Sequence, residues 1–129
     1  PQGLYWLSDE PFTLGRWVVV SARSDDAQWA QTQGFVGRDW PLLKQIAGLP
    51  GDEICRWDTQ LLINGKVGGE ARLRDSSGRD LPSWEGCMVL GQDQLFLMNA
   101  HPDSLDGRYF GPVEIHDLVG VARLILAWR

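Results

Sequence analysis

The sequence lacks the cysteine and histidine spacing of a metal site, the positive charge that nucleic acid requires and a long apolar run. It has two cysteines, and its two histidines, His101 and His116, are too far apart for the ligand spacing of a metal site. The formal net charge of -5 argues against nucleic acid as the main partner, because phosphate binding requires a basic face. No apolar run approaches the roughly 18 residues that would span a bilayer, and no signal-peptide pattern opens the sequence. We therefore expect no metal, no cofactor and no nucleic acid in its function.

The composition that remains is that of an ordinary globular domain. The 129 residues are 43% hydrophobic and 22% charged, without repeats or a low-complexity tract. A chain of this length buries a core without needing many cross-links. We expect residues 1–129 to form a single domain.

Short segments of β type dominate the sequence. Apolar runs rich in β-branched residues predict strands at residues 4–7, 16–22, 87–90, 94–98 and 118–128. One segment, residues 25–33, predicts a helix, which either Ser24 or Asp25 caps and Gly34 ends. Many short strands with a single short helix predict a mainly β fold of antiparallel, coiled or barrel-like sheets.

Two turns and one loop divide these segments. Pro50-Gly51 suits a type II turn, because glycine accepts the positive φ of the second central residue. Residues 61–67 read as a hairpin with Asn64-Gly65 in a type I′ turn. From Gly68 to Gly86 the apolar pattern gives way to Gly, Ser, Asp, Arg and Pro. We interpret residues 68–86 as an exposed inserted loop.

Lys44 has the most specific chemistry in the sequence. It lies in an apolar run, residues 42–47, where strand alternation places Leu42, Lys44 and Ile46 on one face. Low dielectric disfavours the charged amine and lowers the pKa of a lysine, and a neutral lysine can act as a general base. The alternative is an edge-strand lysine whose amine reaches water.

A second segment, Ser104-Leu-Asp-Gly-Arg-Tyr-Phe-Gly111, supplies polar groups in a turn-like setting. Combined with the pattern Lys-x-x-x-Gly-x-Pro-Gly-Asp that starts at Lys44, it resembles the type I signal peptidases, and more closely their conjugal-transfer branch, the TraF-type peptidases. Two weaker blocks, residues 1–5 and 15–20, extend this resemblance over nearly the whole chain.

The resemblance implies a membrane-anchored serine peptidase with a Ser/Lys dyad, in which Lys44 is the catalytic base. The implied nucleophile is a serine two residues before Pro1, in a Ser-x-Pro context that lies outside the given sequence, as do part of the oxyanion hole and the N-terminal anchor. The Ser104 hydroxyl would orient the lysine amine.

The resemblance also gives roles to the residues that follow Ser104. Asp106 would pair with Arg108 and brace the catalytic loop. Asp106 could instead act directly on the lysine, but a carboxylate in contact would raise the pKa of the amine and oppose its role as a base. The sequence departs from the family at Gly107, where serine is common.

The resemblance further implies a site at the periplasmic face of the inner membrane. The implied substrate is a pilin precursor, bound as an extended strand with small residues before the cut and released as a linear or a cyclic product. In such an oxidising compartment we expect a disulfide between Cys55 and Cys87, rather than two free thiols. Trp6 or Trp17 could rest at the membrane interface.

Three other functions stay open at this point. A general signal peptidase would cleave many proteins that carry signal peptides. A self-cleaving repressor would share the Ser/Lys dyad, but repressors of that kind lack the sequences of the two motifs found here. A catalytically silent module of the same fold would only bind peptides as extended strands.

Overall fold

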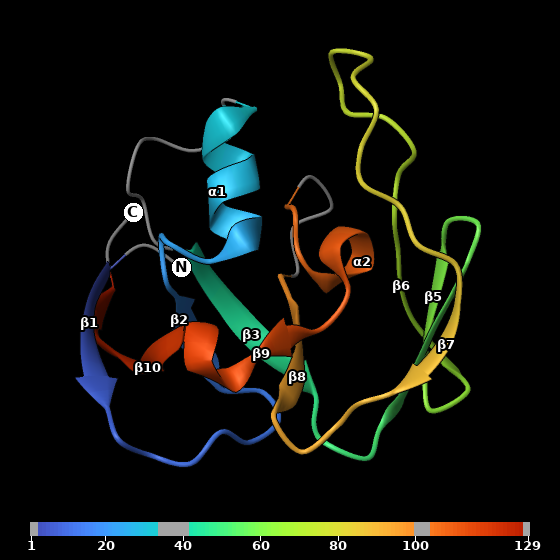
Figure 1. Cartoon of the computed structure of the whole chain (residues 1–129). Helices are drawn as coiled ribbons and strands as arrows, with labels where there is room; N and C mark the ends of the chain where they lie inside the picture. The colour runs from blue at the N-terminus through green and yellow to red at the C-terminus, as the bar shows by residue number, and fades with distance from the viewer. Residues whose placement is uncertain (1–2, 34–41, 100–103, 128–129) are drawn as a thin grey trace. The chain divides into compact units, whose positions relative to one another are not determined.

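A computed structural model describes residues 3–33, 42–99 and 104–127 of the chain (Figure 1). The fold is mainly antiparallel β in two sheets with few helices, as the sequence predicts. The chain divides into two compact units. The first contains residues 1–46 and 116–129, and the second contains residues 47–115.

The first unit is built on four antiparallel strands in the order β1-β10-β2-β3. The strands are β1 (Gly3–Ser8), β2 (Trp17–Val20), β3 (Leu42–Gly48) and β10 (Leu118–Ala127), and β3 runs on into the second unit. Val18 on β2 lies opposite both Val121 and Lys44, and it is fully buried. The alternation of inward and outward residues along β2 and β3 therefore defines the apolar face of this sheet.

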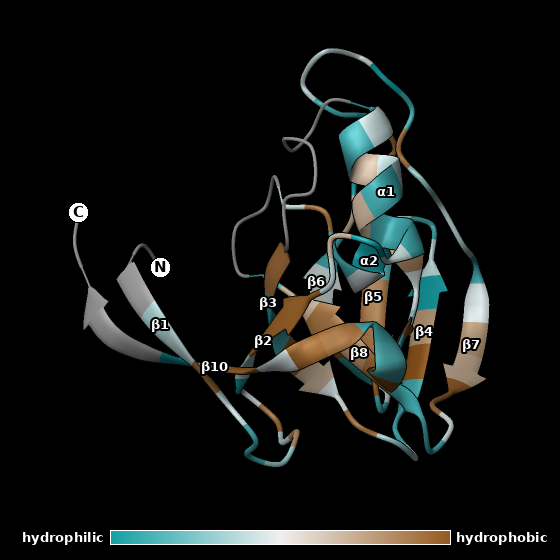
Figure 2. Cartoon of the chain, turned by 60° about the vertical axis from the view of Figure 1, so that its left-hand side comes forward, coloured by the Kyte–Doolittle hydropathy of each residue, from teal (hydrophilic) through white to brown (hydrophobic). Residues whose placement is uncertain are grey.

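Helix α1 (Asp25–Thr32) and the 3-10 turn η1 (Ile115–Asp117) accompany these strands. The Ser24 hydroxyl accepts a hydrogen bond from the Ala27 N–H at 3.2 Å, so Ser24, and not Asp25, is the N-cap. Ala27 and Ala30 are the buried residues of the helix, which is otherwise largely hydrophilic (Figure 2). The expected end at Gly34 lies outside the described residues.

The second unit contains a four-stranded antiparallel sheet in the order β6-β5-β4-β7. Its strands are β4 (Glu53–Trp57), β5 (Gln60–Ile63), β6 (Lys66–Glu70) and β7 (Gly86–Val89). The unit also contains β8 (Gln94–Met98), β9 (Val113–Glu114) and the short helix α2 (Gly107–Phe110). Its core is a cluster of four buried residues: Ile54, Leu61, Leu90 and Phe96.

Both predicted turns are confirmed. The Asp52 N–H donates to the Leu49 carbonyl at 3.0 Å across Pro50-Gly51, and Gly51 has a φ of 93°. Asn64 and Gly65 have φ values of 50° and 80°, as a type I′ hairpin turn requires. Hydrogen bonds from the Leu49 N–H and the Asn64 side chain hold the pKa of Asp52 below its ordinary value.

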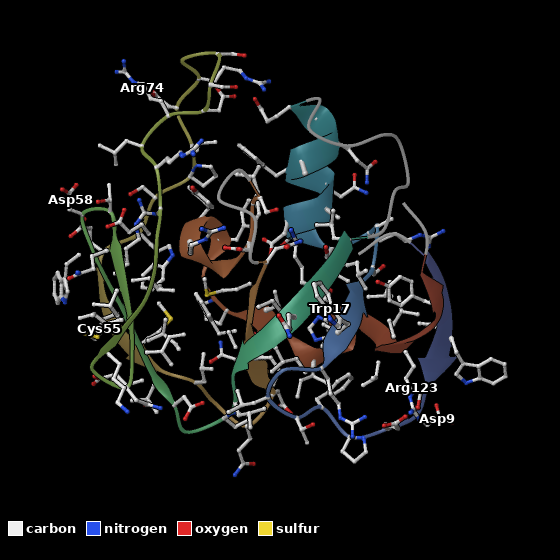
Figure 3. All side chains as sticks on the ribbon, turned by 180° about the vertical axis from the view of Figure 1, so that it is seen from behind. Asp9, Trp17, Cys55, Asp58, Arg74 and Arg123 are labelled. Carbon is white, nitrogen blue, oxygen red and sulfur yellow. A yellow bond between two sulfur atoms is a disulfide. The ribbon has the colours of Figure 1, made fainter. Side chains whose placement is uncertain are left out.

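The segment at residues 68–86 is more ordered than the sequence suggests. Strand β6 continues to Glu70, and Ala71 and Leu81 are buried. Between them the segment is exposed, with Arg74 at its outer end (Figure 3), and two ion pairs, Arg74–Asp80 and Arg79–Asp75, cross it. The side-chain pattern did not predict this part of β6, because Gly68 and Gly69 have no side chains to alternate. Backbone pairing with β5 holds the strand instead.

Candidate active site

Lys44 lies in the middle of β3, on the face of the strand that points inward. Its residue surface is 9% exposed, and Ile46 on the same face is almost fully buried. Val18 lies directly opposite Lys44 on β2 and shares this face. The sequence therefore places a lysine on the buried face of an apolar strand, where burial disfavours the charged form of the amine.

The second group of polar residues, Ser104, Asp106 and Arg108, lies in the second unit, and the structure brings these three residues together. The Asp106 carboxylate and the Arg108 guanidinium form a bidentate ion pair, with Nε–Oδ1 and Nη2–Oδ2 distances of 2.9 Å each. The Arg108 Nη2 also donates to the Ser104 carbonyl at 3.1 Å. Both charged side chains are almost fully buried, at 5% exposure for Arg108 and 0% for Asp106.

Asp106 also closes the loop that carries Ser104. Its Oδ1 accepts the Arg108 backbone N–H at 3.0 Å, which makes it the N-cap of α2. Its Oδ2 accepts the backbone N–H of Asn99, which follows β8, at 2.8 Å. One carboxylate thus ties the end of β8 to the start of α2, and Ser104 lies between these two fixed points.

Gly107 fits this arrangement for a steric reason. A Cβ on this residue would lie 2.6 Å from Cε1 of Phe96 and 2.9 Å from the Leu97 carbonyl oxygen. Phe96 is fully buried, and the carbonyl belongs to the backbone of β8, so neither can move aside easily. In this chain, the serine that is common at this position in the resembled peptidases would meet the same atoms.

Sequence reasoning gave no role to Arg56 and Trp84, which contact α2, or to Tyr109, which lies within it. The guanidinium groups of Arg56 and Arg108 both lie near the Tyr109 ring, with their Cζ atoms 5.8 Å and 5.7 Å from its centroid. The Trp84 Nε1–H donates to the Gly107 carbonyl at 3.1 Å. Strand alternation could have flagged Arg56, because it shares the inward face of β4 with Ile54.

Cys55 and Cys87 are joined by a disulfide in the structure. They lie opposite each other on β4 and β7, with their Cα atoms 4.0 Å apart. Cys55 is buried and Cys87 is exposed (Figure 3 labels Cys55). Glu53 lies beside the two sulfur atoms, but bonded sulfurs are not the thiolates that bind a metal ion.

The structure places three of the four remaining histidines and tryptophans singled out in the sequence. His116 lies in η1 with its side chain 77% exposed, beside Asp117, as expected for a surface residue. His101 lies outside the described residues. Trp6 is exposed on β1, and Trp17 is half-buried on β2.

Comparisons with known proteins agree on one family. Residues 5–128 match the family described as "Signal peptidase, peptidase S26". The chain is 34% identical to a plasmid transfer protein TraF of Escherichia coli, over 99% of this chain and 78% of the relative. It is 30% identical to signal peptidase I V of Bacillus subtilis strain 168, over 62% of this chain and 54% of that protein.

A solved structure shares the fold. The crystal structure of a signal peptidase I from Enterococcus faecalis V583 superposes with a TM-score of 0.51 at 19% identity, covering 88% of this chain and 98% of that one. Within the described ranges of this chain, we find no helix with the length and apolar character needed to cross a membrane.

Proposed function

Because the chain belongs to the signal peptidase family, peptidase S26, we propose that it is the catalytic domain of a Ser/Lys endopeptidase that processes a pilin precursor for conjugative transfer. The observation that carries this proposal is the burial of Lys44: the residue is 9% exposed, on an apolar strand that leads into the Pro50-Gly51 turn. The similarity of the chain to a plasmid transfer protein over 99% of its length supports the assignment to conjugation.

In the proposed reaction the serine two residues before Pro1 is the nucleophile and Lys44 is the base. The neutral amine accepts the hydroxyl proton while the serine oxygen bonds to the scissile carbonyl carbon. The peptide C–N bond then breaks, and the leaving amine takes the proton back from the ammonium group. An acyl-enzyme ester remains on the serine.

The second half of the reaction releases the acyl group. Lys44 removes a proton from water as the water oxygen bonds to the ester carbonyl carbon. The bond between that carbon and the serine oxygen then breaks, the serine takes the proton back from the ammonium group, and the product is linear. If the terminal amine of the pilin attacks the ester in place of water, the product is cyclic. We propose that the Ser104 hydroxyl orients the lysine amine, and that Asp106 acts by bracing the loop with Arg108.

The bidentate ion pair supports the bracing role of Asp106. Its two carboxylate oxygens already accept four hydrogen bonds, from Arg108 and from the Asn99 N–H. A carboxylate that is satisfied in this way does not need the lysine amine as a partner.

We place the protein at the periplasmic face of the inner membrane, held by an N-terminal anchor. The disulfide between Cys55 and Cys87 supports an oxidising compartment, because cytosolic thiols are kept reduced. The substrate would be a pilin precursor bound as an extended strand with small residues before the cut.

The second candidate is a general signal peptidase that removes signal peptides from many secreted proteins. The 30% identity to signal peptidase I V of Bacillus subtilis favours it, although over a smaller part of the chain. The two candidates share the dyad and differ in their substrates.

The test uses the full-length protein, including its upstream segment, incubated with the candidate pilin precursor and with an unrelated precursor that carries a signal peptide. Intact mass spectrometry identifies the products. We expect cleavage of the pilin precursor that is lost in Lys44→Ala and kept in Lys66→Ala, a matched change at the exposed lysine of β6. A product lighter by one water than the linear fragment identifies cyclisation.

Cleavage that persists in Lys44→Ala would refute the dyad. Equal cleavage of both precursors would favour the general signal peptidase. Binding of the precursor without any cleavage would favour a silent peptide-binding module.

A further inference from the structure

Arg56 is a cation in the interior of the second unit. It lies on the inward face of β4, two residues from the core residue Ile54, and its exposure is 0%. Its Nε donates to the Asp58 carbonyl at 2.9 Å and its Nη1 donates to the Arg108 carbonyl at 2.7 Å. Within the described part of the chain, its Nη2 has no hydrogen-bond partner and its guanidinium has no carboxylate partner.

Such a residue is not explained by stability. Burying a guanidinium has a large desolvation cost, and an apolar side chain of similar volume is often as stabilising or more so. An unsatisfied buried N–H adds to this cost. A buried arginine that donates only to main-chain carbonyls therefore acts on the position of the backbone it contacts.

One of the two carbonyls belongs to α2. That helix has four residues, too few to be stable without outside contacts. Asp106 holds its N-terminal end, and the Trp84 indole donates to the carbonyl of Gly107. Arg56 holds the next carbonyl, that of Arg108, from a position 52 residues earlier in the sequence.

The same contact fixes the side chain that reaches Ser104. The Arg108 guanidinium pairs with Asp106 and donates to the carbonyls of Glu70 and Ser104, at 2.9 Å and 3.1 Å. These bonds are made only if the Arg108 backbone is correctly placed. Both guanidinium groups contact the Tyr109 ring, whose hydroxyl accepts the Arg72 N–H at 2.9 Å, so Arg56, Arg108 and this ring pack together.

We propose that Arg56 is a positioning residue of the active site: through the Arg108 carbonyl it sets α2, and through α2 it sets the loop that carries Ser104 and Asp106. This inference rests on the proposed function for its effect on catalysis. Its structural part, the control of α2 by Arg56, stands on the contacts within the second unit.

The test compares four variants of the full-length protein. Arg56→Met keeps the length of the side chain and removes all its donors, and Arg56→Lys keeps the charge and one donor group. Arg74→Met is the matched surface control, because the Arg74 side chain is 70% exposed and paired with Asp80. Leu90→Ala destabilises the core of the unit and leaves in place the hydrogen bonds that Arg56, Trp84 and Asp106 make to α2.

Kinetics with the cleaved precursor is the first readout, expressed per folded molecule. We expect kcat of Arg56→Met to fall at least tenfold with KM within twofold of the wild type, and Arg56→Lys to recover part of kcat. Arg74→Met and Leu90→Ala should keep their kcat. A wild-type kcat in Arg56→Met, or an equal loss in Leu90→Ala, would overturn the proposal.

A second readout does not depend on peptidase activity. Hydrogen exchange of the Trp84 indole N–H and of the Asn99 backbone N–H, followed by NMR, reports on α2 and its loop. Both protons should exchange at least tenfold faster in Arg56→Met than in Leu90→Ala. If no precursor is cleaved by the wild type, the proposed function fails, and this exchange result alone decides the role of Arg56: unchanged protection in Arg56→Met refutes it.

Discussion

Replacing Gly107 with alanine should strongly destabilise the second unit, although it adds a single methyl group. The added Cβ would lie 2.6 Å and 2.7 Å from Cε1 and Cζ of Phe96, and 2.9 Å from the Leu97 carbonyl oxygen. Ordinary Cβ contacts begin near 3.4 Å, so both neighbours would have to move by several tenths of an ångström. Neither is a flexible chain end.

The expected cost follows from how such a site can relax. Overpacking a dense core costs about 1–3 kcal/mol, because side chains leave their rotamers and the backbone shifts. Here one neighbour is a buried ring and the other a main-chain oxygen, so we expect the upper part of that range, about 2–3 kcal/mol. Alanine itself is not disfavoured at a helix start, so the clash dominates the result.

The assay is denaturant unfolding followed by tryptophan fluorescence, with Gly69→Ala as the matched control. The nearest atom to a Cβ on Gly69 is Cε of Met98, at 3.0 Å, the far end of a flexible side chain. That methyl group can swing away, so Gly69→Ala should change the unfolding free energy by less than about 1 kcal/mol. Equal effects of the two substitutions, or a stable Gly107→Ala protein, would refute the packing argument.

Three further predictions concern other parts of the chain. Asp106→Asn leaves the buried Arg108 guanidinium without its anionic partner, so the unfolding free energy should fall by about 3–5 kcal/mol; a loss below about 1 kcal/mol in urea titrations would contradict the bracing role. Replacing Cys55 and Cys87 by serine removes a cross-link over 32 residues and should cost about 3–4 kcal/mol, measured against the oxidised protein; equal stability would mean that the disulfide constrains nothing. Burial, then the charges of Asp117 and Asp25, raise the pKa of Asp26 from 3.8 to about 6. A carboxyl with a raised folded-state pKa stabilises the fold most below pH 3.8, and this contribution is lost as pH rises through 6. Asp26→Asn should therefore stabilise the protein at pH 7, by about 1 kcal/mol after allowance for solvent screening, and have little effect near pH 4; stability curves that do not converge at low pH would contradict this.

Features fixed by local chemistry could be predicted from the sequence. Turn residues determine their own backbone geometry, which is why the turns at Pro50-Gly51 and Asn64-Gly65 have the expected form. Alternation along β3 predicted that Lys44 lies on the inward face with Ile46, because side chains along a strand alternate with a period of two.

Features fixed by distant contacts could not be predicted. Helix α2 is too short for intrinsic propensity to reveal it, and it forms because Asp106, Trp84 and Arg56 satisfy its ends and carbonyls. The Arg56–Arg108 contact joins residues 52 positions apart and leaves no local pattern. Strand β6 was missed at its C-terminal end because glycines carry no side-chain signal.

A titration of the Lys44 amine decides whether Lys44 can be the catalytic base. The chain has two lysines, Lys44 and Lys66, so a protein labelled with ¹³C at the lysine Cε carbon gives two resolvable NMR signals. Lys66 is exposed on β6 and serves as the internal reference. We expect the pKa of Lys44 to lie well below that of Lys66, because a base must be neutral at the working pH. Equal pKa values for the two amines, both about 10.4, would contradict the assignment of Lys44 as the base.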